Sequence, residues 1–153
     1  QLSSGDVYFI ETGALERRLP NLSNRLQILS PFDNSVIQRD RLKHLFQYDY
    51  QIECYVPEAK RKYGYFSLPL LFRGEFIGRM DCKAHRKIRL LEIKSLYLES
   101  NAGQQGFDDD RIINAFMEAI DSFRQFQQCD SVSLTAVNPK RLTLPLQSRL
   151  NAL

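Results

Sequence analysis

The chain has 153 residues, a net charge of +3 and 43% hydrophobic residues, which suits one domain with a buried core, or one domain with part of another. No apolar run approaches the roughly 20 residues of a membrane-spanning helix. The three cysteines form no CxxC pair and only two histidines are present, which argues against zinc and favours a reduced, cytoplasmic compartment. Because the chain starts at Gln1 without a signal-like stretch, we expect it to be part of a longer protein.

Charge is distributed unevenly along the chain. Between Glu58 and Lys94, ten basic residues stand against four acidic ones, whereas the remainder is slightly acidic. This segregation predicts one basic face, one acidic face and a polyanionic partner. The alternative is that these lysines and arginines only solvate exposed strands.

The first elements of the chain are predicted to be short. Residues 6–10 (DVYFI) indicate a strand, and a turn and a short helix (ALERRL) follow before a connector around Pro20. The next apolar stripe predicts a helix over residues 36–46, with Asp33 placed to cap its N-terminus.

Strands are predicted to dominate the middle of the chain. Four strand-like runs cover residues 50–56, 65–72, 75–86 and 87–99. A charged loop (EAKRKYG) follows the first run, and Arg73-Gly74-Glu75 is typical of a tight hairpin connection. The short connections predict an antiparallel sheet that must curl or be covered.

The last third of the chain predicts a helix and one more strand. A polar loop at 101–106 precedes an amphipathic helix over 107–128, opened by three aspartates, and residues 131–137 indicate a strand before a short terminal helix or tail. The order of elements predicts an α+β fold, with an antiparallel, curled or barrel-like sheet packed by the long helix.

The sequence offers little for catalysis. Cys82 and His85 lie close in sequence, but a spacing of three along a strand and turn puts them on opposite faces. The three aspartates at 108–110 read as a helix start. We therefore predict no catalytic residue, metal or cofactor in this chain.

The basic residues give the stronger signal, in three sets on consecutive elements. Cations neutralise phosphates, and aromatic rings beside them stack on bases or support the loop. We expect the sets to form one concave DNA-binding surface. Two alternatives remain: Arg79 pairs only with an acid such as Asp81, and Tyr65 and Phe66 belong to the core. The candidate DNA-binding residues are Arg39, Arg41 and Lys43 in the predicted helix, Lys60, Arg61, Lys62 and Tyr63 in the charged loop, and Arg79, Lys83 and Arg86 in the strand over residues 75–86.

Three segments carry a resemblance to a known family: SPFD, RDRLKHLFQYDYQIECYVPEAKRKYGYFSLP and GRMDCKAHR. In these the chain resembles the bacterial crosslink-repair DNA glycosylases, over most of residues 6–100. Because that family is built from tandem winged helices, the resemblance implies that residues 1–27 are the end of a winged-helix domain and a connector. Residues 28–153 would then form a C-terminal barrel-like α+β domain.

The resemblance also implies a function. Such proteins excise alkylated purines and unhook interstrand crosslinks without a metal, using a Gln-x-Gln or Gln-x-Asp motif in an N-terminal winged helix. Gln125-Phe126-Gln127 matches that pattern only formally, because it falls in the predicted C-terminal helix. The expected partners are damaged double-stranded DNA and winged-helix domains of the same polypeptide. The alternative is a non-catalytic module that only supports those domains.

Overall fold

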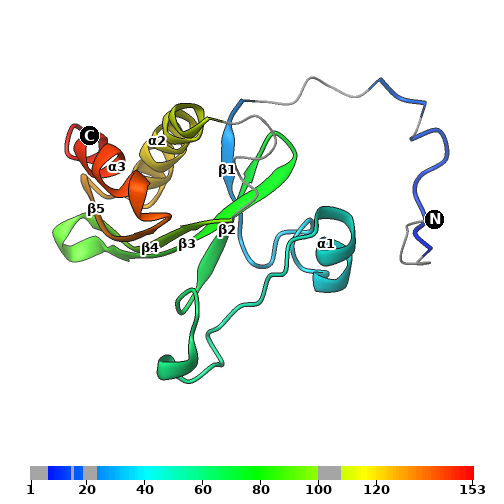
Figure 1. Cartoon of the computed structure of the whole chain (residues 1–153), viewed down its shortest axis with the longest axis horizontal. Helices are drawn as coiled ribbons and strands as arrows, with labels where there is room; N and C mark the ends of the chain where they lie inside the picture. The colour runs from blue at the N-terminus through cyan, green and yellow to red at the C-terminus, as the bar shows by residue number, and fades with distance from the viewer. Residues whose placement is uncertain (1–6, 15, 19–23, 100–107) are drawn as a thin grey trace.

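The structure is a computed structural model that describes residues 7–14, 16–18, 24–99 and 108–153. Figure 1 shows a sheet with helices α2 and α3 above it, a projecting loop below it and α1 to one side. The strands are β1 (Leu26–Ile28), β2 (Ser67–Phe72), β3 (Glu75–His85), β4 (Leu90–Leu98) and β5 (Ser131–Asn138). The helices are α1 (Arg39–Phe46), α2 (Asp109–Phe126) and α3 (Thr143–Leu150), with short 3-10 turns η1 (Glu58–Lys60), η2 (Arg86–Ile88) and η3 (Lys140–Leu142).

The five strands form one open, mixed sheet in the order β1-β2-β3-β4-β5. The first three pairings are antiparallel, but β4 and β5 run parallel. The expectation of an antiparallel, barrel-like sheet is therefore wrong, although the α+β class is confirmed. The reason is the connection: tight hairpins join antiparallel strands, whereas a helix such as α2 between two strands allows a parallel crossover.

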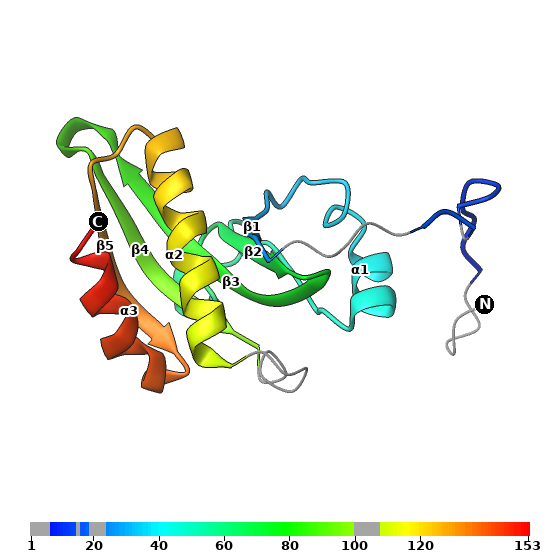
Figure 2. The ribbon, with the colours of Figure 1, turned by 90° about the horizontal axis from the view of Figure 1, so that it is seen from above.

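The main core lies between the sheet and helices α2 and α3, which cover one face side by side (Figure 2). Helix α2 starts where the Asp108 carboxylate accepts the backbone N–H of Arg111 at 2.7 Å, an N-cap that satisfies a free helical donor. Its buried face includes Ile112, Phe116 and Ile120. Each such side chain stabilises the fold by about 1.5–3 kcal/mol through burial.

A smaller core joins α1 to the opposite side of the sheet. It contains Val36, Leu42, Tyr48, Tyr50 and Phe76. Two buried tyrosines fasten this segment to the sheet, because the Tyr48 hydroxyl donates to the Gly78 carbonyl at 2.8 Å and the Tyr50 hydroxyl donates to the Ser67 carbonyl.

The predicted helix over 36–46 is shorter in the structure, and Asp33 does not cap it. Helix α1 begins at Arg39, and its N-cap Gln38 makes no side-chain capping bond. Asp33 instead accepts the hydroxyl and the backbone N–H of Ser35. The hydroxyl bond first and the backbone bond second hold the pKa of Asp33 below its ordinary value.

Two predicted strands are also corrected. Residues 50–56 form no strand: Tyr50 and Glu53 are buried although no strand pairs with this run, whereas Tyr55 is exposed. The run 87–99 is interrupted: η2 and the left-handed Arg89 (φ 52°) turn the chain, so β3 and β4 form a hairpin.

The described part of residues 7–18 contains turns and neither helix nor strand, so the strand expected at 6–10 is absent from Val7–Ile10. The assignment of residues 1–27 to a winged helix stays a prediction. Its boundary at residue 28 falls inside β1, which pairs with β2. The expected connector at Pro20 and loop at 101–106 lie outside the described residues. No helix of the described chain is both long and apolar enough to span a membrane.

Candidate nucleic-acid interface

The segment 53–66, here called the basic loop, is anchored by two buried carboxylates. Glu53 accepts the backbone N–H groups of residues 62–64, at 2.9, 2.6 and 3.0 Å. Asp81 of β3 accepts those of residues 65–66, at 3.1 and 3.2 Å. Hydrogen bonds to a charged acceptor are roughly twice as strong as neutral ones, so five successive donors fix this half of the loop to the sheet.

The protonation and backbone geometry of this anchor are consistent with that role. Burial raises the pKa of Glu53, but the three backbone hydrogen bonds and the positive charge of Arg79 outweigh it, and the pKa lies below its ordinary value. Gly64 sits between the two carboxylates at φ 129°, where a Cβ would lie 2.2 Å from Oδ2 of Asp81. Only glycine fits this position without strain.

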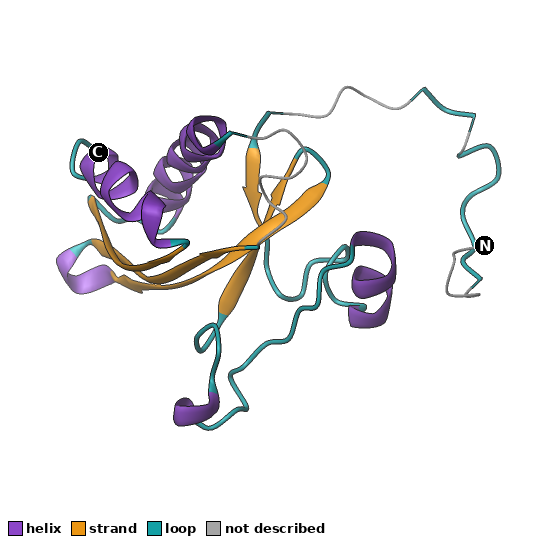
Figure 3. Cartoon of the chain, viewed as in Figure 1, coloured by secondary structure: helices purple, strands orange, loops and turns teal. Residues whose placement is uncertain are grey.

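The other half of the loop is closed by bonds of its own. The N–H of Val56 donates to the Glu53 carbonyl at 3.0 Å, and Nε of Arg61 donates back to the Val56 carbonyl at 2.9 Å. The loop projects away from the sheet and carries η1 at its far end (Figure 3). Lys60 and Lys62 are exposed on it, so the loop presents its cations on a hydrogen-bonded frame.

Arg79 does not belong to the exposed cations, contrary to the prediction. It is only 2% exposed, and its Nη2 donates to the Glu99 carboxylate at 2.6 Å and to the Asp49 carbonyl at 3.0 Å. Its guanidinium carbon lies 4.0 Å from the ring centre of Tyr63 and 4.6 Å from that of Tyr48. A buried charge in these contacts cannot reach a phosphate on another molecule.

The alternative that Arg79 pairs with an acid is confirmed, with Glu99 and not Asp81 as the partner. The role of Tyr63 also differs from the predicted DNA contact, because its ring packs against Arg79. Its ring is half-buried, with the Arg79 guanidinium over it and the Tyr97 ring centre 5.0 Å away in a T-shaped contact. Tyr63 therefore supports the loop in this structure, which was one of the two roles considered for the loop aromatics.

The α1 cations are engaged near their own helix. Arg39 donates to the Pro31 carbonyl at 2.8 Å and lies over a tyrosine ring, and Arg41 donates to the Asn34 carbonyl. Lys43 forms an exposed ion pair with Asp49 at 3.1 Å. Contact with DNA would have to compete with each of these bonds.

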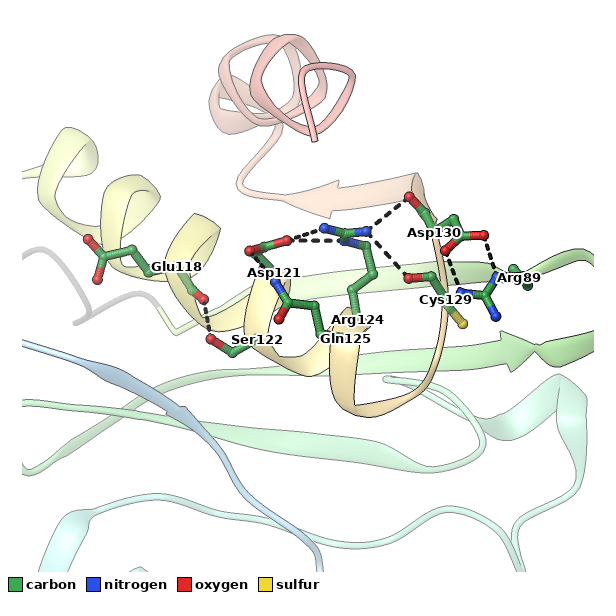
Figure 4. A network of polar contacts seen from close by, with 8 residues as sticks. All are labelled: Arg89, Glu118, Asp121, Ser122, Arg124, Gln125, Cys129 and Asp130. Carbon is green, nitrogen blue, oxygen red and sulfur yellow. Dashed lines mark hydrogen bonds and ion pairs between the residues drawn. The ribbon is translucent and has the colours of Figure 1, made fainter.

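The third set lies at the β3–β4 hairpin. Lys83 and Arg86 are exposed there, and their side chains form no hydrogen bond or ion pair with other described residues. The hairpin end is held through Arg89, which pairs with Asp130 at the start of β5 (Figure 4). Arg124 of α2 donates to the carbonyl of the same Asp130 at 3.0 Å, so the hairpin, α2 and β5 are linked at one junction.

The three basic sets do not form one concave surface. Helix α1 and turn η2 lie at opposite ends of the sheet domain in both views, and the basic loop projects between them (Figures 1 and 2). Glu53 and Asp81 were not predicted from the sequence as anchors of the loop. The sequence does contain a signal for these anchors, because each is the single acidic residue in a run that is otherwise apolar or basic.

Catalytic groups are not brought together in the described residues. Burial first, and Asp81 second, raise the pKa of the Cys82 thiol to about 12, so it is not a nucleophilic thiolate at neutral pH. Nε2 of His85 forms a hydrogen bond with the Glu92 carboxylate, at 2.8 Å. The described ranges contain no group of three or more His, Cys, Asp or Glu that could hold a metal ion. Gln125, part of the formal Gln-x-Gln match, binds Asp121 on α2.

Fold and site together define an α+β chain that presents a hydrogen-bonded basic loop. Comparison with known families then gives a specific result. The family model described as DNA glycosylase AlkZ-like matches residues 2–126, more than half of the chain, and the chain belongs to that family. The resemblance found in the sequence is thus confirmed. No solved structure matches the chain.

Proposed function

We propose that this chain is the DNA-binding accessory domain of a DNA-repair glycosylase that excises alkylated purines and unhooks interstrand crosslinks. Membership of the glycosylase family supports a DNA substrate. The observation that carries the proposal is the basic loop, whose backbone at residues 62–66 is held in place by Glu53 and Asp81. A pre-ordered loop loses little conformational entropy on binding, so more of its electrostatic attraction remains as affinity.

In this proposal the chemistry is done by winged-helix domains of the same polypeptide. Water attacks the glycosidic carbon and the alkylated purine departs. Because alkylation at N7 makes the base a good leaving group, modest help from a general base is enough. The present domain contributes Lys60, Arg61 and Lys62 to the phosphate backbone, with Lys83 and Arg86 at the hairpin as a second contact.

Removing the three loop cations tests this proposal. The Lys60→Ala/Arg61→Ala/Lys62→Ala variant of the 153-residue chain should bind duplex DNA more weakly, and by the same factor for every sequence. The slope of log affinity against log salt should fall by about 0.9 for each phosphate that the variant no longer neutralises. Fluorescence anisotropy over a range of salt concentrations measures both quantities.

A matched control removes three exposed cations elsewhere. Lys94, Arg111 and Lys140 are exposed outside the basic loop, so their joint replacement by alanine should change affinity much less. If the loop variant binds as tightly as the wild type, the proposed contact surface is wrong.

A second candidate function is a packing module that supports other domains. It is favoured by Val7, Phe9 and Ile10, three exposed apolar side chains that are close in sequence, since exposed apolar side chains that cluster mark an interface. The two candidates differ in one measurement, since a packing module would show no duplex affinity even at low salt.

A further inference from the structure

The basic loop exposes two aromatic side chains beside its cations. Tyr55 is 92% exposed and Tyr65 is 53% exposed. Arg61 lies over the Tyr65 ring, 5.0 Å from its centre. Tyr55 has no such contact, because among the described residues no ring or cation packs on it. Its ring therefore has both faces in water.

The position of Tyr55 is fixed by the loop and not by contacts of its own ring. It lies inside the turn that the Val56 N–H closes on the Glu53 carbonyl, and Arg61 is bonded to the same turn through the Val56 carbonyl. The Arg61 side chain therefore binds the residue directly after Tyr55, although six positions separate Arg61 from Tyr55 in the sequence. Tyrosine also has few rotatable bonds, so little conformational entropy is lost when such a ring binds.

We propose that Tyr55 stacks on an unpaired nucleobase of DNA held at the basic loop. This inference rests on the proposed DNA-binding function and adds a ligand class to it. Neighbouring cations would neutralise the phosphates on either side, while the ring supplies an apolar face for the base. Every base has such a face, so the contact selects for unstacked bases and not for sequence.

The size of the effect follows from the energy of base stacking. Stacking of one base on an aromatic side chain corresponds to about 5- to 150-fold in affinity. A fully paired duplex keeps its internal bases stacked on one another and offers Tyr55 no such partner. The chain should therefore prefer DNA with one unpaired base over the matched paired duplex.

The test compares two duplexes of equal length, one fully paired and one with a single bulged 2-aminopurine, on the 153-residue chain. Wild type should prefer the bulged duplex and quench the 2-aminopurine fluorescence. Tyr55→Ala should abolish the preference and the quenching, with affinity for paired duplex and its salt slope unchanged. Tyr55→Phe should retain both effects, because the ring and not the hydroxyl makes the contact.

Phe126 gives a matched control, because its ring is 79% exposed on α2, away from the basic loop. Phe126→Ala should leave the preference intact. A preference that survives Tyr55→Ala, or no preference in the wild type, overturns this inference and leaves duplex binding through the cations standing. Failure of the wild type to bind any duplex overturns the proposed function and this inference together.

Discussion

Gly64 is the residue on which the basic loop depends most directly. We expect Gly64→Ala to destabilise the chain by about 3 kcal/mol or more, because the new Cβ combines strain at φ 129° with a clash against the Asp81 carboxylate. Urea denaturation measures the change. Gly13→Ala is the control: its φ is also positive, at 77°, but nothing lies within 4 Å of the added Cβ, so we expect about 1–2 kcal/mol at most. Equal losses in the two variants would contradict the role of the carboxylate anchor.

Single residues were predicted with uneven success, and the reason is the range of their contacts. The core interpretation favoured for the loop aromatics is wrong for Tyr65, which is half exposed, whereas Phe66 does pack against the main core. Alternation along a strand reports which side chains share a face, but not which face is covered. Arg79 was assigned to the surface for the same reason, since its partner Glu99 lies 20 residues away.

At the scale of elements, Arg79 joins three segments that are distant in sequence. It contacts Tyr63 of the basic loop and Tyr48 after α1, and it pairs with Glu99 after β4. We expect Arg79→Ala to destabilise the chain by about 3 kcal/mol, the lower end for breaking a buried pair, because Glu99 retains some access to water. Arg79→Lys should restore only part of the lost stability, since an ammonium group, unlike a guanidinium, has no planar face to stack on the rings.

Chemical denaturation of both variants tests this element-level role. The control is Arg86→Ala, an exposed position where we expect a change within about 0.5 kcal/mol. If Arg79→Ala is as mild as the control, the buried cation does not join these segments energetically.

Turns and strands that are marked by neighbouring residues in the sequence were predicted correctly. Features that depend on which strands pair with each other were not. Arg73-Gly74 does form a tight turn, with both residues at positive φ between β2 and β3, and the strand expected at 131–137 is β5. The parallel pairing of β5 with β4 was missed because hydrophobic alternation carries no information about strand direction. Strand β1 has only three residues, too few to produce a pattern.

At the scale of the whole molecule, acid should loosen the basic loop. The pKa of Glu53 is lower in the folded chain than its ordinary value of 4.5. Its contribution to stability is therefore complete above about pH 4.5 and is lost as the pH falls through the folded pKa. We expect Glu53→Gln to be less stable than wild type at pH 7, by about 1.5–3 kcal/mol, and this difference to shrink below pH 4.5.

Thermal unfolding of both proteins over a range of pH measures that difference. Asp33, Asp109 and Asp130 also have pKa values below their ordinary value, but they are present in both proteins and cancel in the comparison. A difference that stays constant down to pH 3 would show that the Glu53 carboxylate does not need its charge to hold the loop.

The parallel pairing of β4 with β5 also determines the order in which the sheet can be completed. A chain emerging from the ribosome can form the β2 to β4 ladder from hairpins, and β1 is made before these strands, whereas β5 follows them in sequence and joins only after α2 has crossed the sheet. Until then the nine-residue β4 has an open edge, and open edges recruit strands from other molecules. Pairing with β5, which lies beyond the stretch matched by the family, removes this edge of β4 and leaves the eight-residue β5 as the edge strand of the sheet.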